Sequence, residues 1–270
     1  MKSHISRRAM LAGSGCLGAF GLLPATAAWS QAAAPASAGM APVCLSMYYM
    51  AGDDAKFDRM QYREKHAPLL REIYGDSLDR IELRTAPPRE RKRLQGHTEA
   101  PMPEPPVLAV ESLWIKNLES YAAATRNAGN KIAEDMSKIT KARITLQYEQ
   151  LAAEQGEPRA GIVQGSKCFS SLYPAKDGST WDTDYYTRTM LPLISEVYGP
   201  DALSRVEVCK GVSVPGGGKP VITSAVHMYV KNEQAFGQAG MKGGMRLFGE
   251  AAKYTNIMPV SAMYDVYVVG

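Results

Sequence analysis

The chain of 270 residues contains an internal repeat, and this repeat constrains the fold more than any other feature. Residues 57–75 align without a gap with residues 181–199, at an offset of 190 − 66 = 124 positions. The identical pairs are Asp58/Asp182, Tyr62/Tyr186, Pro68/Pro192, Leu69/Leu193, Glu72/Glu196, Tyr74/Tyr198 and Gly75/Gly199. Such self-similarity predicts two copies of one supersecondary unit. The copies differ at His66, which Met190 replaces, so only the first copy carries a side chain there that titrates near neutral pH.

Both copies show the same order of predicted elements, β-α-β-β-α-β. Strands are predicted where apolar and polar residues alternate, and helices where apolar residues recur every three or four positions. In the first copy the strands are residues 43–50, 78–86, 107–115 and 143–152, and the helices are residues 56–75, 117–124 and 131–136. In the second copy the strands are residues 167–173, 203–212, 220–230 and 261–269, and the helices are residues 180–199 and 232–236. Glycines at positions 240, 243 and 244 predict a break in the continuation of the last helix.

This order of elements is that of a ferredoxin-like module, in which helices cover one face of an antiparallel sheet. The other face must also be buried, and the sheet of the neighbouring copy can cover it. We therefore predict an α+β protein in which two fused ferredoxin-like modules form one barrel, with a cavity where the inner side chains do not fill the space. The predicted modules are residues 42–152 and 166–270, joined by a linker at 153–165 that is rich in glycine.

The N-terminus has the form of a twin-arginine export signal. Arg7 and Arg8 precede an apolar stretch that is too short and too rich in glycine and alanine to span a membrane. Residues 25–27 offer a small-x-small cleavage site, so we predict a signal peptide at 1–27 and a disordered tether at 28–41. The expected partner is the twin-arginine export machinery. The expected location is periplasmic or secreted, without membrane insertion after the signal is removed.

The charge balance argues against a nucleic-acid partner. Removal of the signal takes away Lys2, Arg7 and Arg8, which leaves 31 − 3 = 28 basic residues against 27 acidic ones. A protein that binds nucleic acid usually carries a basic excess on one face. The nearly neutral mature chain lacks such an excess.

Three cysteines remain after the signal, Cys44, Cys168 and Cys209, each within an apolar strand-like segment. No CxxC motif or spacing of cysteine with histidine typical of a metal site is present. We predict that the three residues are buried core thiols and that there is no metal site. Cys44 and Cys168 also match at the offset of 124, which favours equivalent packing positions over a disulfide.

Several segments resemble the EthD-like family of the dimeric α+β barrel superfamily. In the second copy these are residues 171–174, Trp181-Asp182 and residues 191–194, and in the first copy Phe57-Asp58 and residues 66–70. Residues 133–140 resemble the second motif of the family. The resemblance implies a pocket beneath the first helix of each module, with the helix histidine facing it. The superfamily includes cofactor-independent monooxygenases, lactone isomerases, polyketide-type cyclases and, in more distant branches, haem enzymes.

His66 and Tyr62 are the predicted catalytic residues. A partly buried imidazole beside a phenol can act as a general acid or base near neutral pH. Tyr62 lies four residues earlier, on the same helix face, where its hydroxyl could orient the ring or donate to a developing oxyanion. The alternatives are a core histidine bonded to the backbone and a tyrosine that only packs. Acid/base chemistry is not expected in the second module, because Met190 cannot exchange a proton.

Seven further residues are predicted to contact a ligand. Tyr49 and Tyr173 lie at the ends of equivalent strands. Trp114 and Tyr229 are also equivalent and could form flat walls of a binding site for an aromatic ligand. Core packing is an alternative for all four residues. The other candidates are Tyr186, Met190 and His227. Strand alternation places His227 on the side opposite the apolar positions, and therefore toward the barrel interior.

The sequence thus favours an exported enzyme without metal or nucleotide that acts by proton transfer on a small apolar or aromatic oxygenated molecule. Isomerisation, cyclisation and cofactor-free oxygenation all fit this prediction. No cofactor is expected, and haem is the alternative suggested by the distant branches. The second hypothesis is a non-catalytic periplasmic protein that binds a hydrophobic small molecule.

Overall fold

A computed structural model of the chain describes residues 41–52, 55–87 and 106–269. The predicted signal peptide and residues 28–40 of the predicted tether lie outside these ranges. The described strands form one closed antiparallel barrel in the order β1-β3-β2-β8-β5-β7-β6-β4. The strands are β1 (Val43–Met50), β2 (Leu78–Thr85), β3 (Val107–Ile115), β4 (Arg143–Gly156), β5 (Lys167–Pro174), β6 (Leu203–Ser213), β7 (Ile222–Val230) and β8 (Val260–Val269).

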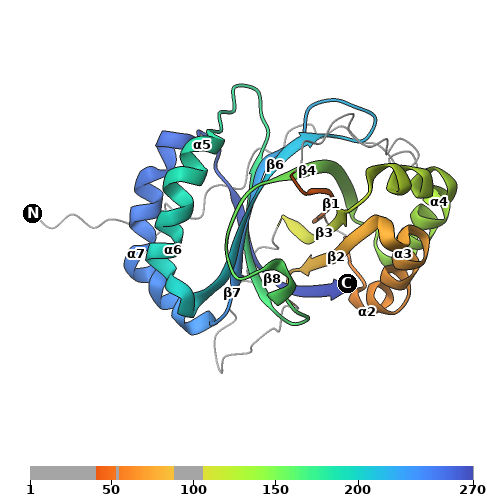
Figure 1. Cartoon of the computed structure of the whole chain (residues 1–270), viewed down its shortest axis with the longest axis horizontal. Helices are drawn as coiled ribbons and strands as arrows, with labels where there is room; N and C mark the ends of the chain where they lie inside the picture. Colours follow the sequence, from red (N-terminus) through yellow and green to blue (C-terminus); the bar gives the residue numbers. More distant parts are fainter. Residues whose placement is uncertain (1–40, 53–54, 88–105, 270) are drawn as a thin grey trace, which may run out of the picture.

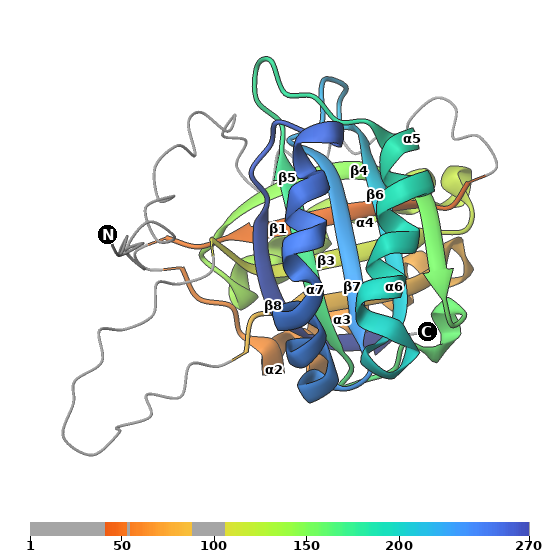
Figure 2. The same cartoon turned by 90° about the vertical axis from the view of Figure 1, so that its left-hand side faces the viewer.

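The barrel consists of two ferredoxin-like sheets joined at their edges, which confirms the predicted fold. Strands β1 to β4 form the sheet of module 1 and β5 to β8 that of module 2. The junctions are the antiparallel pairs β2 with β8 and β4 with β6. The helices lie in two layers on opposite outer sides of the barrel, with α3 and α4 beside module 1 and α6 and α7 beside module 2 (Figure 1). Figure 2 shows α6 and α7 crossing in front of the sheet of module 2.

The helices of module 1 are α2 (Arg59–Gln61), the π-helical turn η2 (Tyr62–His66), α3 (Ala67–Tyr74) and α4 (Leu118–Ile139). Those of module 2 are α5 (Thr183–Tyr185), the π-helical turn η5 (Tyr186–Met190), α6 (Leu191–Ala202) and α7 (Glu233–Tyr254). The short 3₁₀ turns are η3 (Gly75–Ser77) and η4 (Arg159–Gly161). Among the described helices, none is both long and apolar enough to cross a lipid bilayer.

The second helix of each module is continuous, so the predicted breaks are wrong. Helix α4 runs through both predicted pieces, and α7 runs through its glycines. A glycine inside a helix costs about 1 kcal/mol relative to alanine, but packing can outweigh this cost. At Gly243 an added Cβ would lie 2.6 Å from Val197 Cγ1 of α6. The glycine therefore permits close contact between the two helices, which local sequence cannot indicate.

Strand β4 is longer than predicted and ends at Gly156. Its additional residues pair with β6, where Gln155 lies opposite Val206 and Gly156 opposite Arg205. At Gly156 the backbone has φ 105° and an added Cβ would lie 2.3 Å from Ser204 O. Only glycine allows this close approach at the junction between the modules.

Large side chains occupy the barrel interior, where the sequence predicted a cavity. Fully buried Tyr48, Arg84, Tyr229 and Tyr264, together with Trp114, lie on the strand faces opposite the clusters beneath the helices and therefore point into it. The three cysteines are also buried there as free thiols, as predicted. The apolar layers beneath the helices lie on the opposite side of each sheet. Each sheet is thus covered on both faces. The layer beneath the helices is mainly apolar, whereas the barrel interior mixes apolar side chains with buried charged and polar ones.

Candidate functional site

The histidine of the first copy lies at the end of a π-helical turn. Asp58 caps the helix start by accepting a bond of 2.9 Å from the Gln61 amide, and the Ala67 amide bonds to Tyr62 O five residues earlier. Pro68 has no amide proton, so a regular α-helical hydrogen bond is impossible there. Module 2 repeats this turn at η5, although it lacks the histidine. The turn is therefore a property of the repeated scaffold and does not itself indicate chemistry.

His66 is paired with an acid on the neighbouring helix. Its Nδ1 lies 2.8 Å from Asp135 Oδ2, on α4. A carboxylate only accepts hydrogen bonds, so this contact places the ring proton on Nδ1. The His66 side chain is fully buried, and its Nε2 has no hydrogen-bond partner within the described part of the chain. An imidazole fixed at Nδ1 with an unpartnered Nε2 has the hydrogen-bond pattern of a general base, although the Nε2 atom itself is buried in this structure.

A buried glutamate lies in the same layer. Glu111 of β3 is 0% exposed and accepts hydrogen bonds from Tyr49 Oη at 2.6 Å and Tyr62 Oη at 2.7 Å. Burial raises the pKa of Glu111, while the positive charge that His66 carries when protonated and the hydrogen bonds from the two hydroxyls oppose this rise. Burial and the nearby Glu111 raise the pKa of both tyrosines, which therefore remain donors. We call Tyr49, Tyr62, His66, Glu111 and Asp135 the module 1 cluster.

The raised pKa of Glu111 predicts a pH-dependent stability. A carboxyl group whose pKa is higher in the folded than in the unfolded chain stabilises the fold when it is protonated. This stabilisation is complete when the pH is below the ordinary pKa of 4.5, and it is lost as the pH rises through the pKa of the folded state. We expect the Glu111→Gln variant to lack this loss. Urea unfolding of both proteins between about pH 4 and pH 8 measures it. If the free energy of unfolding of wild type relative to the variant does not fall over this range, the prediction is wrong.

Module 2 does not reproduce the module 1 cluster. Met190 replaces His66. An offset of 115 residues relates β3 and α4 to β7 and α7, so Val226 is the equivalent of Glu111 and Glu250 is the equivalent of Asp135. Glu250 instead accepts hydrogen bonds from Tyr185 and Lys253. Of the residues described here, only those of module 1 combine the histidine, the acid on α4 and the buried glutamate in one layer.

The corresponding layer of module 2 is aromatic. Trp181 stacks on Tyr186 with ring centroids 4.9 Å apart, and Tyr173 Oη lies 3.3 Å from Tyr254 Oη. Met190 packs in the same buried cluster. Tyr173, Tyr186 and Met190 were predicted to contact a ligand, and all three are buried beneath α6 and α7.

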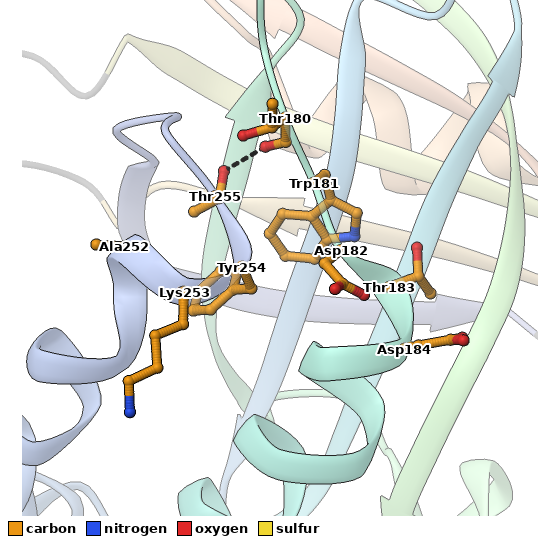
Figure 3. Close-up of a pocket in the computed structure, with 9 residues that line it drawn as sticks. All are labelled: Thr180, Trp181, Asp182, Thr183, Asp184, Ala252, Lys253, Tyr254 and Thr255. Carbon is orange, nitrogen blue, oxygen red and sulfur yellow. Dashed lines mark hydrogen bonds between the residues drawn. The ribbon is translucent and has the colours of Figure 1, made fainter.

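An open surface pocket of about 410 Å³ lies at the outer edge of this aromatic layer. In Figure 3 its residues come from the start of α5 and the end of α7, and Thr255 Oγ1 donates a bond of 2.8 Å to Thr180 O. It is lined by Thr180, Trp181, Asp182, Thr183, Asp184, Ala252, Lys253, Tyr254 and Thr255. None of the predicted site residues lines this pocket.

The remaining predicted residues lie inside the barrel. Trp114 stacks beneath the Arg159 guanidinium at 3.6 Å, and Tyr229 Oη donates to Glu82 at 2.5 Å. Val226 and Met228, the neighbours of His227, pack in the layer beneath α6 and α7, so His227 points to the opposite side, into the barrel, as predicted. The nine predicted residues are thus divided among the layer beneath the helices of module 1, the layer beneath the helices of module 2 and the barrel interior. Only Tyr49, Tyr62 and His66 lie together in the layer of module 1.

Sequence reasoning missed Glu111 and Asp135 as members of the site. Alternation along β3 places Glu111 between Ala109 and Leu113 on the helix-facing side, so an acid among apolar positions was the available signal. Asp135 lay within the segment that resembles a family motif, but nothing in the sequence linked it to His66.

Comparison with known proteins supports the fold. No protein-family model matches the sequence, and no curated protein matches it. The solved structure of an anthrone oxidase-like protein is similar, with a TM-score of 0.54, 10% identity and coverage of 86% of this chain and 93% of that chain. An EthD-like protein from Ralstonia eutropha has 26% identity and a TM-score of 0.35 over 37% of this chain and 90% of its own. A haem-binding protein from Thermus thermophilus has 9% identity and a TM-score of 0.42 over 85% of this chain and 92% of its own. The closed barrel of two ferredoxin-like sheets and the similarity to the anthrone oxidase-like structure show that the chain has the fold of the dimeric α+β barrel proteins, formed within a single polypeptide.

Proposed function

We propose that the protein is an exported, cofactor-independent enzyme in which His66 exchanges a proton with a small apolar or aromatic oxygenated molecule. The reaction is of the isomerase, cyclase or monooxygenase type. The observation that carries the proposal is the His66–Asp135 contact of 2.8 Å, which leaves Nε2 without a partner in a buried layer. Asp135 holds the proton at Nδ1 and stabilises the imidazolium that forms when Nε2 accepts a proton.

The surroundings of His66 support an apolar aromatic substrate. The ring of Tyr62 lies 5.4 Å from that of His66, and Phe57 and Tyr267 contact Tyr62 in turn. Asp135 is 14% exposed, so the buried histidine lies one layer beneath the surface. Movement between η2 and α4 would admit the substrate, and such gating motions are common in enzymes.

The decisive experiment compares the two modules. We expect His66→Gln to lower turnover by about 10²- to 10⁴-fold and Asp135→Asn to lower it to a smaller extent, because general acid–base catalysis contributes about this much. The matched control is Glu250→Gln, the equivalent of Asp135 in module 2, which should retain wild-type turnover. Anthrone, a polycyclic aromatic ketone, is a suitable first probe, with oxygen uptake and product absorbance as the measurements.

Two outcomes contradict this assignment. Unchanged turnover in folded His66→Gln removes the catalytic role of the histidine. Tight retention of the compound by wild type without product over a long incubation indicates the binding-protein alternative.

Export is the second part of the proposal. The adjacent Arg7 and Arg8 and the small residues 25–27 support the twin-arginine route with cleavage after residue 27. N-terminal sequencing of the protein recovered from the periplasm should begin near residue 28. Recovery of the protein from the cytoplasm with an intact N-terminus would argue against export by this route.

A further inference from the structure

Three side chains with different metal-binding chemistry meet inside the barrel. Glu149 of β4, Cys209 of β6 and His227 of β7 each place one ligand atom within 4.8 Å of the other two. All three residues are at most 1% exposed. Strands β4, β6 and β7 are neighbours in the barrel, so the three side chains belong to one continuous part of its wall.

Other buried residues already hold two of these side chains in place. Ser170 Oγ lies 2.9 Å from His227 Nδ1, so the imidazole can bind a metal through Nε2. Ser46 Oγ donates to Glu149 Oε2 at 2.8 Å, and Gln147 Nε2 donates to Glu149 Oε1 at 2.7 Å. Hydrogen bonds of this kind orient the ligands in protein metal sites.

We propose that Glu149, Cys209 and His227 bind one divalent transition-metal ion, of which zinc fits the donor set best. Thiolate, imidazole and carboxylate are the zinc ligands of proteins. A tetrahedral ion with bonds of about 2.0–2.3 Å holds its ligands about 3.5 Å apart, so a movement of about 1 Å closes the site. One thiolate and one carboxylate offset the two charges of a divalent ion, which lowers the cost of burying it. No sequence pattern indicated this site, because its ligands come from three separate strands.

The site does not follow from the symmetry of the repeat. Glu149 pairs with Cys44 and Tyr264 pairs with the equivalent Cys168, so Tyr264 is the equivalent of Glu149. In the same way, Arg84 is the equivalent of Cys209 and Ser112 that of His227. None of these equivalents is a usual zinc ligand. Within the residues that the structure describes, the repeat therefore provides no second copy of the proposed site. The site lies on the side of the barrel wall away from the helices. It is independent of the module 1 cluster, which lies beneath α3 and α4.

Metal analysis of the purified full chain tests the proposal. Protein produced in zinc-supplemented medium should contain about one equivalent of zinc per chain. After refolding with cobalt(II) it should show the charge-transfer absorption of a cobalt–thiolate bond. Cys209→Ser should lose both signals, and His227→Gln should lose most of the bound metal.

The matched control is Cys168→Ser. Cys168 is another fully buried thiol of the barrel interior but lies outside the cluster of three ligands. This variant should retain the metal and the cobalt spectrum. Wild type that contains no metal after both treatments overturns the proposal, and so does equal loss of metal in Cys168→Ser and Cys209→Ser. If Cys209→Ser does not fold, the metal content and cobalt–thiolate absorption of wild type and Cys168→Ser decide the question.

Discussion

Replacement of Glu207 by alanine is expected to lower the free energy of unfolding by about 3–5 kcal/mol. Glu207 is 0% exposed and accepts hydrogen bonds from Arg205 Nε at 2.7 Å and Arg159 Nε at 2.8 Å. Its removal leaves both guanidinium groups in the barrel wall without this counter-ion. Glu154 still pairs with both arginines, but its side chain is 48% exposed, so the guanidinium groups lose their only fully buried partner among these acids. Breaking a buried ion pair costs more than most point mutations. Urea unfolding at neutral pH measures the difference.

The effect of Glu207→Ala should also depend on pH. Burial raises the pKa of Glu207, but the charges of Arg159 and Arg205 and their hydrogen bonds outweigh it and hold the pKa below its ordinary value of 4.5. A depressed pKa gives stability that is present above 4.5 and lost as the pH falls through the folded pKa. The difference between wild type and variant should therefore shrink in acid.

The control for this variant is Glu196→Ala. Glu196 pairs with Arg246 at 2.9 Å, but the two side chains are 62% and 58% exposed. An exposed pair of this kind contributes about 0–1 kcal/mol. Equal losses in the two variants would show that the buried ion pairs of Glu207 add nothing beyond a surface contact.

Replacement of Gly211 by alanine is the second change with a large expected effect. An added Cβ would lie 2.1 Å from Ile222 O and 2.7 Å from Pro220 Cβ, and backbone cannot move aside as a flexible side chain can. It would also disturb Gln147, whose side chain bonds to Ile222 O at 3.0 Å and to the Ile222 amide at 2.8 Å. We expect a loss of about 1–3 kcal/mol or more in the free energy of unfolding.

Gly237→Ala provides the comparison for Gly211→Ala. No atom lies within 4 Å of the Cβ position at Gly237, which is in α7. Alanine should raise the stability there by up to about 1 kcal/mol, because it favours the helix. A melting temperature for Gly211→Ala equal to that of wild type would show that the barrel wall yields easily at this point.

The parts of the structure that the sequence predicted follow from regular local patterns. The repeat and the alternation along β7 were enough for the two-module barrel and for the inward orientation of His227. The contact of His66 with Asp135 joins residues 69 positions apart and depends on how α4 crosses η2. The continuity of α7 depends on the fit of Gly243 against Val197. Such features arise from packing between elements, which periodicity does not contain.

Closure of the barrel has a consequence for assembly. Every strand of the described barrel is paired on both sides, so no free edge remains to which a strand of another protein could add. Interfaces of this barrel with other proteins would therefore form through helices or loops. The exposed Met241, Met245 and Phe248 on α7 show that the helical surface also carries apolar side chains.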